Sequence, residues 1–169
     1  MRIRLLIAGG SIDKAYNELT GDLAFGDTQL NKMVEQARFK GDLVVEHLLM
    51  KHSYDMTQKD YDMLAGACVD AQEDHIVVTH GTITMVQSAQ NIAKALKGKS
   101  KTIVLTGARI PYSLGNTSDA LFNLGTALAF VQALPSGVYV AMNGQAFPCD
   151  NVQRDGASGV FQEVALAKH

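Results

Sequence analysis

The chain is poor in the residues that mark several classes of protein. It has no tryptophan and only two cysteines, Cys68 and Cys149, which lie far apart and match no metal-ligand spacing. This scarcity argues against a disulfide framework and against a zinc module. No apolar run approaches the roughly 20 residues of a membrane-spanning helix, and the first run stops at Ala8, short of the roughly 7–15 residues of a secretion signal. We therefore expect a cytoplasmic protein with no membrane partner.

Neither sign of charge dominates, because the formal net charge is only −2. The basic cluster in residues 94–101 has a lysine spacing typical of a solvated helix end and loop, so we predict no nucleic-acid partner. Hydrophobic residues make up 47% of the chain, which indicates a packed core rather than a disordered chain. Because the length suits one domain, we assign residues 1–169 to a single domain.

Strand-like and helix-like segments alternate along the chain. Apolar, β-branched runs predict strands at 4–8, 43–50, 76–79, 102–106, 137–142 and 160–165. Apolar residues at three- and four-residue steps predict helices at 57–72, 84–96 and 118–133, and a further helix from about residue 28. Thr57 is a suitable N-cap for the first of these. The alternation predicts a three-layer, doubly wound α/β domain with a mainly parallel sheet.

Hydroxyl side chains follow several of the predicted strands. Ser11 ends a Gly-Gly-Ser turn after the first strand, and Thr82 ends a His-Gly-Thr turn at a helix start. Ser53 and Thr106 also lie at strand ends. A helix start exposes unpaired N–H groups that suit an anion, and parallel sheets bind ligands beyond their carboxyl ends. The sequence therefore predicts a site with two hydroxyls at this edge of the sheet.

These segments together resemble the bacterial-type L-asparaginase family. Residues 8–12 are similar to its Thr-Gly-Gly-Thr-Ile motif, and residues 80–85 to its His-Gly-Thr-Asp-Thr-Met motif. Weaker matches follow the family order at 53–57, 106–108, 118–124 and 142–143, with Arg154 about ten residues later. The resemblance covers nearly the whole chain and is closest to short members that lack the C-terminal domain. It implies the α/β fold of the family's N-terminal domain.

The resemblance also implies a reaction and a set of site residues. Ser11 would attack the side-chain amide of L-asparagine, ammonia would leave, and water would release aspartate from the acyl-enzyme. No metal or cofactor is implied, and a homo-oligomer would form through a surface other than the absent C-terminal domain. The implied catalytic residues are Ser11, Tyr16, Thr82 and Arg154, and the implied substrate-binding residues are Gly10, Ser53, Tyr54, Gly81, Ile83 and Ala108.

Two positions depart from the family pattern. Ile83 stands where the family has the Asp that binds the substrate ammonium, and Arg154 stands where it has the catalytic Lys. An isoleucine cannot balance a cation, and an arginine stays charged and cannot act as a base. A second interpretation is therefore a relative that binds a small amino acid or a dicarboxylate without turning it over well.

Two further features have alternative interpretations. Residues 15–27 could be a lid over the site or an ordinary surface loop. His80 could belong to a catalytic triad, but no carboxylate partner is indicated, which favours a packed structural histidine. The remaining histidines show no metal-ligand spacing.

Overall fold

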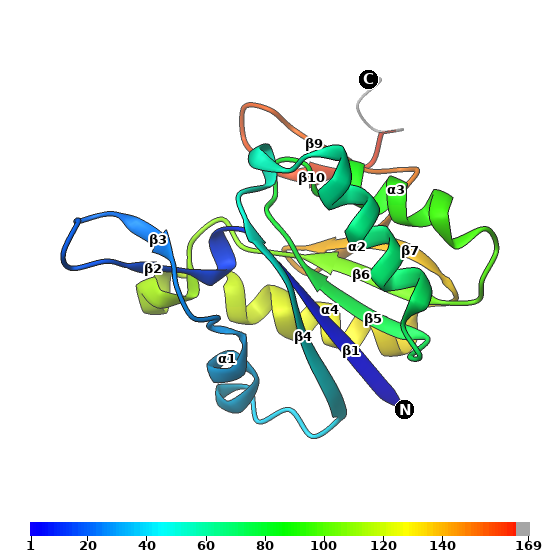
Figure 1. Ribbon diagram of the computed structural model, residues 1–169, viewed down its shortest axis with the longest axis horizontal. Helices are drawn as coiled ribbons and strands as arrows, with labels where there is room; N and C mark the ends of the chain where they lie inside the picture. The colour runs from blue at the N-terminus through cyan, green and yellow to red at the C-terminus, as the bar shows by residue number, and fades with distance from the viewer. Residues whose placement is uncertain (165–169) are drawn as a thin grey trace.

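The computed structural model describes residues 1–164 of the chain and contains one central sheet of six strands (Figure 1). The strand order is β4-β1-β5-β6-β7-β8, and every strand is parallel to its neighbours except β8, which runs antiparallel to β7. The strands are β1 Arg2–Gly9, β4 Asp42–Lys51, β5 His75–Thr79, β6 Thr102–Thr106, β7 Gly137–Met142 and β8 Gln145–Pro148.

Helices cover both faces of this sheet (Figure 1). The helices are α1 Leu30–Gln36, α2 Gln58–Asp70, α3 Met85–Leu96 and α4 Ala120–Ala133. Successive strand residues point to opposite faces, so Leu6 packs in the cluster beneath α2 and α3, whereas Leu5 packs in the cluster beneath α1 and α4. Burial on both faces explains the continuous apolar strands. The predicted three-layer, mainly parallel α/β fold is confirmed.

The start of α2 is fixed by a buried carboxylate. Asp60 accepts hydrogen bonds from the backbone N–H of Thr57 at 2.7 Å and from its hydroxyl at 2.8 Å. The ammonium of Lys51 lies 2.9 Å from both carboxylate oxygens. Hydrogen bonding to Thr57 and Lys51 lowers the pKa of Asp60 to about 2. Thr57 is the N-cap, as the sequence predicts, and the loop between β4 and α2 is anchored at both ends.

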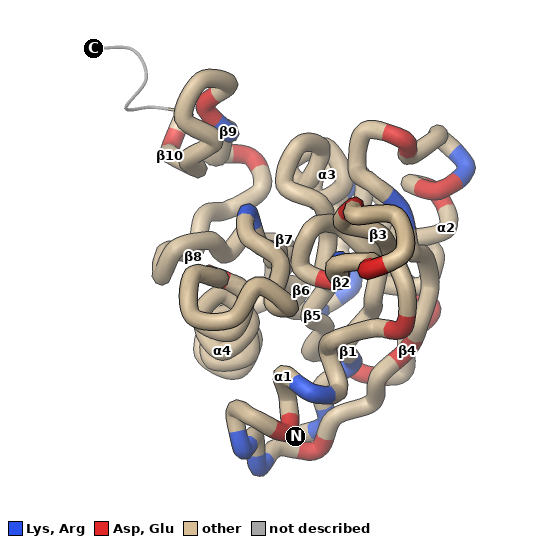
Figure 2. Tube along the Cα trace, turned by 90° about the vertical axis from the view of Figure 1, so that its left-hand side faces the viewer, with Lys and Arg blue, Asp and Glu red and all other residues tan. Residues whose placement is uncertain are grey.

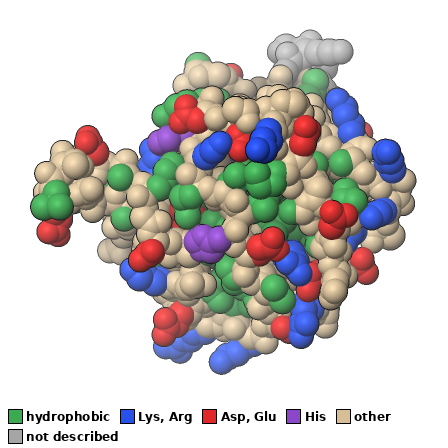
Figure 3. Space-filling model, in the orientation of Figure 1, with side chains coloured by type: hydrophobic (Ala, Val, Ile, Leu, Met, Phe, Trp, Pro, Cys, Tyr) green, Lys and Arg blue, Asp and Glu red, His purple; other side chains and the backbone are tan. Residues whose placement is uncertain are grey.

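Residues 15–27 belong largely to a β-hairpin rather than to an irregular loop. Its strands are β2 Lys14–Tyr16 and β3 Leu23–Phe25, which pair antiparallel. Asp13 closes the base of the hairpin, because its carboxylate accepts hydrogen bonds from the Thr28 hydroxyl at 2.6 Å and the Gln29 N–H at 2.8 Å. The hairpin projects from the body at the left of Figures 1 and 3.

The strand predicted at 160–165 is present only as a two-residue strand, and it does not join the main sheet. Within the described residues, β10 Phe161–Gln162 pairs antiparallel with β9 Gln153–Arg154 in a separate two-stranded sheet. Residue 165 lies outside the described residues. The sixth strand of the main sheet is β8, which the sequence analysis missed. Its signal was the Asn143-Gly144 turn, where both residues have positive φ, as tight hairpins between antiparallel strands require.

Candidate functional site

The site lies where the strand order reverses. The chain leaves β1, pairs β4 on one side of it, and then crosses to β5 on the other side. Such a reversal opens a crevice at the carboxyl ends of the strands. The loops after β1, β4 and β5 meet there, and Figure 2, which faces this edge, shows the β2–β3 hairpin in front of the central strands.

Two glycines allow these loops to touch. A Cβ on Gly10 would lie 2.5 Å from the backbone nitrogen of Gly81, and Gly10 has a φ of +86°, which side chains rarely adopt. A Cβ on Gly81 would lie 2.5 Å from the Oγ of Ser53. The loop after β5 therefore sits between the loops after β1 and β4, and the glycines of both motifs are explained by close backbone approach.

A small cavity of about 60 Å³ opens between the loops. Because a water molecule takes up roughly 30 Å³ in the liquid, this volume suits one small polar group of a ligand that extends outward. The hydroxyls of Ser11, Ser53 and Thr82 come from three different loops. The lining residues are Gly10, Ser11, His52, Ser53, Tyr54, Gly81, Thr82 and Ile83.

The cavity contains all but three of the predicted site residues. Tyr16 is 59% exposed on the outer hairpin, because its pairing with Leu23 fixes it there. Ala108 is buried in the apolar cluster beneath α4. Arg154 is held in β9, and its Nη2 lies 2.8 Å from the point where a Cβ on Gly159 would stand. None of these three residues lines the cavity, and their roles in catalysis or substrate binding stay predictions.

Thr106 also lies away from the cavity. Its hydroxyl is buried and donates to the carbonyl of Ala141 at 2.8 Å. This hydrogen bond links the end of β6 to β7, so the Thr106 hydroxyl stabilises the sheet and does not line the cavity.

His80 is a packed structural residue, as the sequence analysis favoured. Its Nδ1 donates to the Gly81 carbonyl at 2.7 Å, so its Nε2 accepts from the Ser88 hydroxyl at 2.8 Å. Burial lowers the pKa of His80 to about 4, which keeps the ring neutral at ordinary pH. The ring links the loop after β5 to α3 and fixes the backbone beside Thr82.

His52 is the lining residue that the sequence analysis did not assign to the site. Its ring is stacked on Tyr54, with centroids 4.9 Å apart and planes at 18°, and lies 4.9 Å from the Phe25 ring at 57°. Neither ring nitrogen has a hydrogen-bond partner within residues 1–164. The available signal was its position directly before Ser53 at a strand end.

The lining contains no carboxylate among the described residues. The same part of the chain holds no group of three His, Cys, Asp or Glu side chains placed to bind a metal ion. It also has no helix that is both long and apolar enough to cross a membrane. The polar groups at the cavity are therefore hydroxyls, backbone amides, an imidazole and a phenol.

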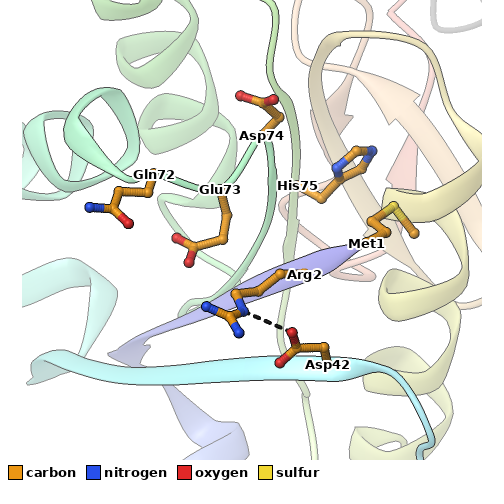
Figure 4. Close-up of a pocket in the computed structure, with 7 residues that line it drawn as sticks. All are labelled: Met1, Arg2, Asp42, Gln72, Glu73, Asp74 and His75. Atoms are coloured by element: carbon orange, nitrogen blue, oxygen red, sulfur yellow. Dashed lines mark hydrogen bonds and ion pairs between the residues drawn. The ribbon is translucent and has the colours of Figure 1, made fainter.

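A larger depression of about 710 Å³ lies at the opposite, amino edge of the sheet (Figure 4). Its charged groups are already paired, because Arg2 lies 2.8 Å from Asp42, Glu73 lies 2.6 Å from Arg4, and Asp74 lies 4.0 Å from Lys101. It has no strand-end loop with hydroxyls, so the small cavity is the better candidate site.

A doubly wound α/β domain with hydroxyls from three loops at its switch point defines a candidate amide- or ester-hydrolysing site. The family model "Asparaginase, N-terminal" matches residues 2–162, and the chain belongs to this family. It is 28% identical over 144 residues to the L-asparaginase of Thermococcus kodakarensis, a match that spans 83% of this chain and 44% of that protein. It is 29% identical over 151 residues to a component of the glutamyl-tRNA(Gln) amidotransferase of Aeropyrum pernix, a match that spans 85% of this chain and 35% of that protein.

Solved structures show the same relationship. The thermostable L-asparaginase from Thermococcus kodakarensis superposes with a TM-score of 0.82 at 27% identity, covering 97% of this chain and 51% of that one. A "probable cytoplasmic L-asparaginase" from Campylobacter jejuni superposes with a TM-score of 0.79 at 27% identity, covering 96% of this chain and 52% of that one. The chain thus spans about half or less of the length of these relatives. The resemblance drawn from the motifs is confirmed at the level of the family and the fold.

Proposed function

We propose that this protein hydrolyses the side-chain amide of L-asparagine to give L-aspartate and ammonia. The observation that carries the proposal is that Ser11 and Thr82 line one cavity at the switch point of the sheet. Ser11 Oγ attacks the amide carbon and loses its proton, and the C–N bond breaks as nitrogen gains a proton. Water then attacks the resulting ester and restores the serine hydroxyl.

The neighbouring loops supply the other roles in this proposal. Ser53 and the adjacent backbone bind the substrate carboxylate, and Tyr54 lies at the outer wall. The Thr82 hydroxyl and backbone N–H stabilise the oxyanion, which is the role that pre-positioned donors serve best in a site shielded from water. Gly10 and Gly81 keep the backbone close enough for these contacts.

A second function is favoured by one specific observation. Ile83 lines the cavity, and no described carboxylate there could pair with the ammonium of an amino acid. A relative that binds a small dicarboxylate, and turns amides over poorly, would have such a lining. We keep this as the alternative.

Cytoplasmic location and self-association complete the proposal. Both cysteines are free, and burial raises the pKa of Cys68 to about 12, so this thiol is packed as a small apolar group. The Campylobacter jejuni neighbour is described as cytoplasmic, and a homo-oligomer is expected by resemblance to the family. Sedimentation of the purified chain measures the assembly directly.

The test is ammonia release from asparagine and glutamine by purified protein. Ser11→Ala should abolish release while the circular dichroism spectrum stays unchanged, and Ser11→Thr should retain it because the hydroxyl remains. Ser136→Ala, directly before the first residue of β7, is the matched control and should release ammonia as the parent does. Near-parental activity in Ser11→Ala would show that the nucleophile is elsewhere, and a parent that binds asparagine without releasing ammonia would favour the alternative.

A further inference from the structure

We propose that His52 is the catalytic residue that carries the proton between Ser11 and the leaving group. This inference deepens the proposed function and rests on it. It starts from the position of His52 in the wall of the cavity that Ser11 and Thr82 also line. His52 and Ser11 line the same cavity of about 60 Å³, and the proposal places one small ligand group in contact with both side chains.

The other basic groups near the site are unsuited to this step. Tyr16 is 59% exposed and lies outside the cavity wall. Arg154 stays charged and is held in the β9–β10 hairpin. Both ring nitrogens of His80 are occupied, and the ammonium of Lys51 is bound by the carboxylate of Asp60. Among the described lining residues, His52 carries the one imidazole, and the phenol of Tyr54 stacks on it.

The surroundings of His52 hold its ring in place without using its nitrogens. Tyr54 stacks on one side, and Phe25 from the projecting hairpin contacts the ring at a steep angle. Aromatic contacts of this kind favour one ring orientation. The residue is half-buried and lines the cavity, and no hydrogen bond within the described residues occupies its nitrogens. An imidazole changes its charge closest to neutral pH and can both accept and donate a proton there.

The proposed step balances without an added reactant. An imidazole nitrogen of His52 takes the proton of Ser11 Oγ as the Oγ–C bond forms and the carbonyl π electrons move to oxygen. The imidazolium then gives that proton to the amide nitrogen as the C–N bond breaks, and ammonia leaves. In the second half, the imidazole takes a proton from water as the water oxygen attacks the ester, and returns it to Ser11 Oγ as the serine departs.

The contact with Phe25 also connects this residue to the hairpin. Phe25 lies in β3, and its ring packs against His52 from a separate part of the chain. A hairpin that moved would therefore change the position of the proposed base. In this arrangement the hairpin supports the proton-transfer group rather than supplying it.

The test compares two variants of His52 with a control histidine. His52→Phe keeps an aromatic ring between Phe25 and Tyr54 but removes the nitrogens, and it should lower kcat roughly 100-fold or more with little change in KM. His52→Gly leaves a space, and added imidazole should restore part of its activity. His75→Phe, at the amino end of β5, changes the same residue type far from the site and should match the parent. Circular dichroism of each variant establishes that the fold is retained.

Each outcome decides the proposal. Loss of kcat in a folded His52→Phe, together with rescue of His52→Gly by imidazole, supports it. An unchanged kcat in His52→Phe, or a loss that imidazole does not restore, overturns the role of His52 while asparaginase activity stands. A parent that releases no ammonia overturns both this inference and the proposed function, so the two failures are distinguishable.

Discussion

Ile83→Asp is the substitution that most directly tests how the cavity recognises its ligand. Ile83 follows Thr82 in the second motif and lines the cavity, where no described carboxylate is present. An ammonium group bound there would lose water contacts without gaining an anion. Adding a carboxylate at this position should therefore strengthen the binding of asparagine.

The expected gain in binding free energy depends on how exposed the side chain at position 83 is to solvent. Two unit charges about 4 Å apart attract with about 1 kcal/mol in water and about 4 kcal/mol near a protein surface of intermediate dielectric. Because Ile83 is 56% exposed, the lower part of this range applies, and the gain should be about 1–2 kcal/mol. This corresponds to roughly 5–30-fold tighter binding.

Calorimetry with asparagine and with succinamate, which lacks the ammonium, measures the effect. Ile83→Asp should raise the affinity for asparagine relative to succinamate, whereas Ile83→Asn, similar in shape but uncharged, should leave that ratio close to the parent's. An unchanged ratio in Ile83→Asp would refute the reasoning, because it would mean that the side chain at position 83 does not face the ammonium.

Three further predictions concern stability. Gly10→Ala should destabilise the fold by about 1–3 kcal/mol in urea unfolding, because the added Cβ meets backbone atoms at a residue with positive φ. Gly26→Ala should not destabilise it, because a Cβ there meets nothing within 4 Å. Equal effects of the two substitutions would contradict the close contact between the loops. Because the pKa of His80 is lower in the folded than in the unfolded chain, the unfolded chain binds a proton first as the pH falls. The contribution of His80 to the free energy of unfolding should therefore be constant above about pH 6.5 and fall by on the order of 3 kcal/mol as the pH approaches 4. A His80→Gln variant should lose this dependence on pH. Asp60→Asn should cost about 0.5–2 kcal/mol at pH 7, and because the folded pKa is lowered to about 2, its difference from the parent in thermal unfolding should vanish as the pH falls from about 4 to 2.

The sequence by itself determined the α/β architecture and the approximate position of the site. Five parallel strands and their helices could be predicted from the sequence. A strand buried on both faces is a continuous apolar run, whereas a helix buried on one face has apolar residues at three- and four-residue steps. The sequence predicted that three hydroxyl residues lie close together, because the carboxyl ends of parallel strands share one edge of the sheet. These residues are Ser11, Ser53 and Thr82. Thr57 could be recognised as an N-cap because capping is a local interaction.

Only the tertiary structure decided which side chains surround the cavity. Tyr16 lies outside it because β2 pairs with β3, and Arg154 because β9 pairs with β10, and both pairings join residues whose local patterns are weak. His52 lies in the wall, where Phe25, 27 positions earlier in the chain, packs against its ring. Local patterns fix the path of the backbone, whereas the direction of a side chain beyond a strand end depends on contacts between distant segments.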